Sequence, residues 1–149
     1  MKRLVVKYWV LVVVWLVVIF IFSTDLFAIG ETFRYIVPLL RFFFPSLSPR
    51  QLEFWHAVIR KLGHVTEYFI LALFTYRSFR QQPLPFTRAL VLTFIFVAIA
   101  ASFDEVHQGF TLFRGASPID VGYDCLGAFG ALLLIWTYET RRIRTHPLL

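Results

Sequence analysis

The sequence predicts an all-α integral membrane bundle of four transmembrane helices, with an interfacial segment between spans 1 and 2. Composition is the first reason: of 149 residues, 58% are hydrophobic and only 16% are charged. The mean hydropathy of +0.70 is too high for a soluble globule. The second reason is that four long apolar segments alternate with turn signals and charges. Without a linker, low-complexity tract or repeat, residues 1–149 are expected to form a single domain.

The first span is expected at about residues 4–22, an apolar run long enough to cross ~30 Å of hydrocarbon. A cleaved signal peptide is the alternative, because a basic N-terminal stretch precedes the run and Ala28-x-Gly30 resembles a cleavage site. The long apolar region, separated from that site by Asp25 and bulky residues, favours a retained span.

The second span is expected at residues 57–76, within a longer helix. Ser48 can cap that helix and Gln51 can close a capping box, while nothing interrupts the helical pattern before Pro83. Such a helix exceeds the hydrocarbon thickness, so its first turns should lie in headgroups and water. The preceding apolar segment, residues 35–44, is too short to cross and is expected to lie in the interface.

The third span is expected at residues 89–103, with the helix continuing as far as residue 108. A loop follows, and Ser117-Pro118-Ile119-Asp120 repeats the capping signature before a fourth span at residues 121–138. Asp120 therefore has a structural interpretation as part of a helix cap, whereas Asp124 lies one turn deeper.

Lysine and arginine positions predict the orientation. With the N-terminus inside, the inner segments contain nine basic residues and one acid, Glu139. This bias predicts that both termini lie in the cytoplasm, and it explains the net charge of +6 without a nucleic-acid partner. The nine are Lys2, Arg3, Lys7, Arg77, Arg80, Arg88, Arg141, Arg142 and Arg144.

Polar side chains interrupt the apolar spans in three places, and the predicted topology brings all three to the outer leaflet. An ionisable side chain at mid-helix costs roughly 2.5 to 3.5 kcal/mol on insertion scales, which makes it a candidate for function. Gly127 and Ala131 share a helix face with the acids of the fourth span and would let another backbone approach closely. The polar residues are Arg60, Lys61, His64, Glu67 and Tyr68; then Asp104, Glu105 and Gln108; then Asp120 and Asp124.

The order of these residues resembles the VanZ-like family. The motif is Lys61-x-x-His64-x-x-x-Tyr68, then Glu105-x-x-Gln108, then Arg114, Asp120 and a polar residue at position 124 followed by Gly127. Two positions depart from the family pattern: Asp124 replaces a frequent Asn, and Ala131 replaces a later Gly. The resemblance implies a four-span layout and a link to resistance against teicoplanin, a glycopeptide that binds cell-wall precursors outside the membrane.

The leading hypothesis is a pocket that binds an outer-leaflet anionic lipid or a lipid-linked cell-wall intermediate. Arg60, Lys61 and Arg114 would hold phosphate, and the carboxylates would order these cations or contact sugar or peptide groups. Membrane lipids are thus the expected partners, and no cofactor is expected. The candidate ligand-binding residues are Arg60, Lys61, His64, Tyr68, Glu105, Gln108, Arg114, Asp120 and Asp124.

An intramembrane enzyme acting on a lipid is the alternative. Glu105 or Asp124 would be the general base, His64 an acid or base, and Arg114 would stabilise developing negative charge. The sequence contains neither a Gly-x-Ser-x-Gly elbow nor a His-Glu-x-x-His helix, and the spacing of its acids and His64 is not diagnostic of a metal, so none is assigned.

Structural interpretations stay open beside these. Arg114 could pair with Asp104 or Asp120, the cations at residues 60 and 61 could extend to headgroups, and Tyr68 could be an interfacial aromatic. Collectively, the polar residues could be a network that holds the helices together, although such a network is costly without a ligand. A small transporter subunit is less favoured, because the first span contains no charged residue between positions 8 and 24.

Overall fold

The chain is all-α in a computed structural model that describes residues 2–112 and 116–145, which confirms the all-α part of the predicted fold class. Described side chains run from residue 6 to 112 and from 116 to 142. The elements are α1 (Lys2–Phe22), the 3-10 turn η1 (Asp25–Phe27), α2 (Ile29–Phe43), α3 (Pro49–Phe79), α4 (Phe86–Gly109) and α5 (Pro118–Thr145).

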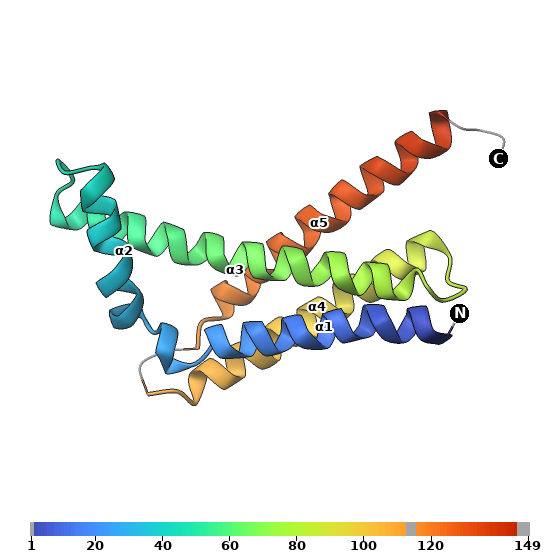
Figure 1. The fold of residues 1–149 in the computed structure, drawn as a ribbon, viewed down its shortest axis with the longest axis horizontal. Coiled ribbons are helices and arrows are strands. Elements are labelled where there is room, and N and C mark those ends of the chain that lie inside the picture. Colours follow the sequence, from blue (N-terminus) through green and yellow to red (C-terminus); the bar gives the residue numbers. More distant parts are fainter. Residues whose placement is uncertain (1, 113–115, 146–149) are drawn as a thin grey trace.

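Helices α1, α3, α4 and α5 run back and forth along the longest axis of the molecule (Figure 1). The start of α1, the α3–α4 turn and the last turns of α5 lie toward one end, which we call the basic end because it contains Arg77, Arg80 and Arg88. The opposite end contains η1, α2, the end of α4 and the start of α5, and we call it the polar end.

Helix α3 is the centre of the fold and packs against α1, α4 and α5. Alanine supplies four of the nine core residues, which keeps the helix axes close together. The core residues are Val12, Ile19, Tyr68, Leu71, Ala72, Val97, Ala101, Ala128 and Ala131.

Gly127 marks the closest approach of α5 to α3. A methyl group added there would lie 2.2 Å from the carbonyl oxygen of Val65 and 3.1 Å from the amide nitrogen of Phe69. Both atoms belong to the α3 backbone, so only glycine fits. The expectation that Gly127 and Ala131 admit a neighbouring backbone is therefore confirmed at Gly127, and Ala131 lies fully buried in the same interface.

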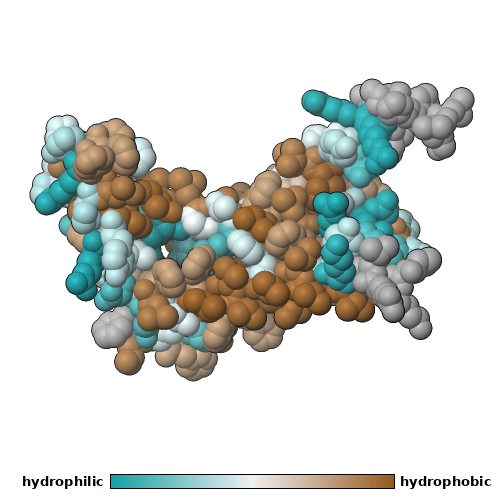
Figure 2. Space-filling model, viewed as in Figure 1, coloured by the Kyte–Doolittle hydropathy of each residue, from teal (hydrophilic) through white to brown (hydrophobic). Residues whose placement is uncertain are grey.

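Large apolar side chains cover the outside of the bundle. A band of them crosses the middle of the molecule, while hydrophilic side chains gather toward the ends (Figure 2). Helices α4 and α5 are each long and apolar enough to cross a membrane, and α1 qualifies when counted with η1 and α2, from which a 65° bend separates it. These helices indicate a membrane protein. Among the described residues, α3 does not qualify by itself, and it contains several charged residues in its first half.

The predicted start of the second helix is confirmed in detail. The hydroxyl of Ser48 accepts a hydrogen bond from the backbone amide of Gln51, and the side-chain oxygen of Gln51 accepts one from the backbone amide of Ser48. Pro49 occupies the first turn. The helix that contains the segment expected to be interfacial begins before residue 35, at Ile29. Its first turns are amphipathic, so they do not form a continuous apolar run in the sequence.

Candidate functional site

Helix α3 approaches α5 at the polar end through two charged pairs, one half-exposed and one buried. In the first, Lys61 Nζ lies 3.2 Å from Asp120 Oδ1 and 4.0 Å from the ring centre of Tyr123. The same cation thus meets a carboxylate and an aromatic face, both on the first turns of α5. Asp120 also lies in the first turn of α5, as the capping pattern predicted.

The second pair joins His64 to Asp124. Nδ1 of His64 lies 3.2 Å from Oδ1 of Asp124, whose side chain is only 1% exposed. A carboxyl group buried this deeply is costly unless a partner faces it, and His64 is that partner. The two groups lie close together without hydrogen-bond geometry. Because Nδ1 is the ring nitrogen next to Asp124, Nε2 lies on the opposite side of the imidazole.

Glu105 connects α4 to the start of α5. Its Oε1 accepts a hydrogen bond from the backbone amide of Ser117, immediately before Pro118 begins α5. The residue is 5% exposed, and within the described part of the chain its Oε2 has no hydrogen-bond partner. Glu105 therefore holds the start of α5 through Oε1, while Oε2 can still accept a hydrogen bond.

Tyr68 lies in the core rather than at an interface. Its side chain is fully buried, and the hydroxyl has no hydrogen-bond partner among the residues that the structure describes. The interfacial-aromatic interpretation of Tyr68 is therefore wrong. Its hydroxyl faces an apolar groove described below.

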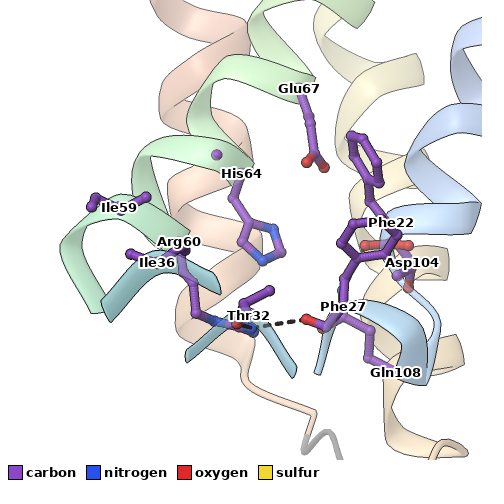
Figure 3. A pocket seen from close by; sticks show the side chains of 12 residues that line it. Phe22, Phe27, Thr32, Ile36, Ile59, Arg60, His64, Glu67, Asp104 and Gln108 are labelled. Atoms are coloured by element: carbon purple, nitrogen blue, oxygen red, sulfur yellow. Dashed lines mark hydrogen bonds between the residues drawn. The ribbon is translucent and has the colours of Figure 1, made fainter. Parts of the chain in front are cut away.

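A partly open cavity of about 200 Å³ lies beside these pairs (Figure 3). His64 enters it from α3, while Asp104 and Gln108 face it from α4. Gln108 Nε2 donates a 2.7 Å hydrogen bond to Asp104 Oδ2, which orients both groups. The lining residues are Phe22, Ser23, Phe27, Thr32, Ile36, Ile59, Arg60, Gly63, His64, Glu67, Asp104 and Gln108.

Arg60 borders the cavity and connects α3 to η1 and α2. Its Nη1 donates to the carbonyl oxygen of Phe27 at 2.9 Å and to Oγ1 of Thr32 at 3.1 Å (Figure 3). Thr32 Oγ1 also lies 3.0 Å from Nε2 of His56, the side chain one helical turn before Arg60. Arg60 thus closes one side of the cavity by holding α2 against α3.

An apolar groove of about 420 Å³ adjoins the cavity between α1 and α4. Leu16, Ile19, Phe96 and Ile99 are among its lining residues, and Tyr68 faces it from α3. Asp104 lines both the groove and the cavity. Most of the wall of the cavity is apolar, and we call it the polar cavity because Arg60, His64, Glu67, Asp104 and Gln108 also line it. A cavity that contains charged and amide groups thus adjoins a mainly apolar groove, an arrangement that suits an amphiphile.

The structure divides eight of the nine predicted binding residues into two sets. Arg60, His64 and Gln108 line the cavity. Lys61, Tyr68, Glu105, Asp120 and Asp124 lie behind it, in pairs or in the core. Arg114 lies outside the described residues, so its predicted pairing and phosphate contact stay predictions.

Two polar cavity residues were not expected from the sequence. Ser23 directly follows α1, and its Oγ lies 3.2 Å from Nδ1 of His107; Thr32 lies in α2. Neither is ionisable, so neither contrasts with its apolar neighbours as Glu67 and Asp104 do. Within the described residues, no three His, Cys, Asp or Glu side chains form a group that could hold a metal ion.

Comparison with known proteins gives one match. A protein-family model described as VanZ/LLP1 matches residues 8–139. A search of curated proteins and a search of solved structures each found no match.

Proposed function

The chain belongs to the VanZ/LLP1 family, and we propose on this basis that it is a four-pass protein of the bacterial cytoplasmic membrane. Its polar end faces outward and binds an anionic lipid or a lipid-linked cell-wall intermediate of the outer leaflet. The positive-inside rule supports this orientation, because the basic end contains Arg77, Arg80 and Arg88, together with the start of α1 and the last turns of α5.

The observation that best supports lipid binding is the polar cavity beside the apolar groove. A headgroup in the cavity would meet donors from Arg60, His64 and Gln108, while the chain would lie along the groove. Glu67 and Asp104 also line the cavity, and their carboxylates suit hydroxyl, sugar or peptide N–H groups better than a bare phosphate. This chemistry favours a headgroup with both phosphate and hydrogen-bond donors.

The proposal revises the roles of the cations. Lys61, expected to hold phosphate, is paired with Asp120, so Arg60 is the cation that lines the cavity, with the imidazole of His64 as a further polar group. The carboxylates of Asp120 and Asp124 order side chains behind the cavity rather than contacting the ligand.

Lipid co-purification tests this function. Wild-type protein in mild detergent should retain one anionic or polyprenyl-linked lipid above its abundance in the membrane. The variant Arg60→Gln should lose that enrichment, and Arg50→Gln, an exposed cation at the start of α3, should keep it. The same unselective lipid in all three proteins would contradict the proposal.

A second candidate function is acid–base catalysis on the bound lipid, favoured by the His64–Asp124 geometry. Glu105 and Asp124 do not line the cavity, so the base expected among them is replaced by His64, with Asp124 as its positioning residue. His64 Nε2 would accept a proton from water or a lipid hydroxyl attacking an electrophile. Membranes containing wild-type protein would then convert the lipid, and His64→Gln would abolish turnover but keep binding. Binding with no turnover in either protein would exclude this candidate.

Family membership supports a third part of the proposal, a contribution to teicoplanin resistance. Expression in a susceptible Gram-positive host should raise the inhibitory concentration of teicoplanin, and Arg60→Gln should remove the effect. Unchanged susceptibility with normally folded wild-type protein in the membrane would contradict this part of the proposal.

A further inference from the structure

A large cavity lies at the basic end, far from the polar cavity along α3. Helix α5 diverges from α3 toward its C-terminus (Figure 1), and the space between α1, α3 and α5 measures about 740 Å³. This volume falls within the range of small-ligand sites. The lining residues are Tyr8, Leu11, Leu73, Phe74, Tyr76, Arg77, Arg80, Leu134, Ile135, Tyr138 and Glu139.

The cations of this basic-end groove lie beside tyrosines. The guanidinium of Arg77 lies 5.6 Å from the ring centre of Tyr8, which holds it near the mouth of the groove. Arg80 donates from Nη1 to the carbonyl oxygen of Leu84 at 3.2 Å, a bond that uses one of its five N–H donors. Glu139 is the one acid among the lining residues, so the lining has a net positive charge.

A buried polar group in the groove wall indicates that a ligand belongs there. The Tyr76 side chain is only 8% exposed and lies near Arg80, and within the described residues its hydroxyl forms no hydrogen bond of good geometry. Leaving such a group unpaired costs about 1 to 3 kcal/mol. An acceptor on a bound molecule would remove this cost.

We propose that the basic-end groove binds one anionic phospholipid. Its acyl chain lies along Leu11, Leu73 and Leu134, and its phosphate accepts hydrogen bonds from Tyr76 and the two arginines. Charge favours a phospholipid over a second apolar helix, because a helix would bury the arginines without an anion. The site rests on the proposed insertion in a membrane but not on ligand binding at the polar end.

Native mass spectrometry of the purified protein in mixed micelles of phosphatidylglycerol and phosphatidylcholine tests this site. Wild type should bind phosphatidylglycerol selectively, and Tyr76→Phe, which keeps the ring, should weaken that binding roughly tenfold. Arg77→Gln combined with Arg80→Gln should remove the preference for the anionic lipid.

One control and one background separate the groove from other cations. Arg88→Gln removes an exposed charge at the same end outside the groove lining, and it should bind phosphatidylglycerol as wild type does. All variants are also measured in an Arg60→Gln background, in which the polar end no longer contributes anionic-lipid binding, and the loss of selectivity in Tyr76→Phe and in the double variant should persist there. Equal binding of the two lipids by wild type, or full selectivity in Tyr76→Phe and in the double variant, would overturn the proposal. Added glycerol phosphate should not compete, because it lacks the acyl chain.

Discussion

His64 Nδ1 and Asp124 Oδ1, 3.2 Å apart, connect the wall of the polar cavity to the buried interface of α3 and α5. One residue of the pair lines the cavity, and the other is fully buried. Three residues further along α5, Gly127 contacts the α3 backbone directly. The orientation of the cavity histidine therefore depends on the packing of two helices.

Replacing His64 by alanine should destabilise the protein strongly. The change leaves the carboxyl group of Asp124 buried without its partner, and removing one member of a buried pair costs about 3 to 5 kcal/mol. Unfolding in mixed micelles with increasing denaturing detergent measures this free energy. The matched background is Asp124→Asn. There, His64→Ala should lower the free energy of unfolding clearly less, because no buried carboxyl group is left without its partner. Equal costs in both backgrounds would show that the two groups do not interact.

Gly127→Ala should disrupt the α3–α5 interface. The added methyl group would meet Val65 and Phe69 backbone atoms, which cannot move aside by changing rotamer, so we expect a loss of about 3 kcal/mol or more. Gly130→Ala is the control, since its methyl group would lie 3.7 Å from the Phe69 ring, an ordinary contact. Thermal unfolding should therefore separate the two variants, and similar midpoints would contradict the packing described.

Arg60→Ala should loosen α2. The substitution removes the hydrogen bonds to Phe27 and Thr32 that hold η1 and α2 against α3. Hydrogen bonds from a charged donor contribute about 1.5 to 3 kcal/mol, so backbone amides of α2 should exchange at least roughly tenfold faster. Hydrogen exchange followed by mass spectrometry gives the rates. Arg50→Ala, which removes an exposed arginine, should leave the exchange rates of α2 unchanged. Unchanged rates in Arg60→Ala would show that its hydrogen bonds do not stabilise α2.

Cysteine labelling should place the two ends of the bundle on opposite sides of the membrane. In a Cys125→Ser background, Ser46→Cys lies in the α2–α3 loop at the polar end and Gln82→Cys in the α3–α4 turn at the basic end. A membrane-impermeant maleimide should label Ser46→Cys in intact cells and Gln82→Cys only after permeabilisation. The reverse pattern would invert the orientation, and labelling of both sites in intact cells would exclude a pass by α3.

Local signals were sufficient to predict the helices but not the role of α3. The capping residues Ser48 and Gln51 specify a helix start through contacts within four residues, so their pattern is visible in sequence. The division of polar residues between cavity and interhelical pairs depends on helix rotation and on distances between segments. Lys61 and Arg60 are adjacent in sequence, yet one contacts α5 and the other contacts η1 and α2.

The amphipathic start of α2 contains a part of the site that could not be predicted from the sequence. Thr32 is an unremarkable residue in the chain, and it becomes part of the site only because Arg60 and His56 reach it from α3. Long-range contacts of this kind have no signature in a single sequence. The small residues of α5 did have one, because Gly127 and Ala131 share a helix face.

Photo-crosslinking from inside the polar cavity tests ligand binding most directly. A benzophenone amino acid at Ile59, which lines the cavity, is compared with one at Val106, an exposed residue of α4 that lines neither the cavity nor the adjoining groove. After irradiation in native membranes, mass spectrometry identifies the attached lipid. The proposed function predicts one anionic or polyprenyl-linked lipid at Ile59 and bulk phospholipid at Val106. The same mixture of bulk lipids at both positions would contradict it.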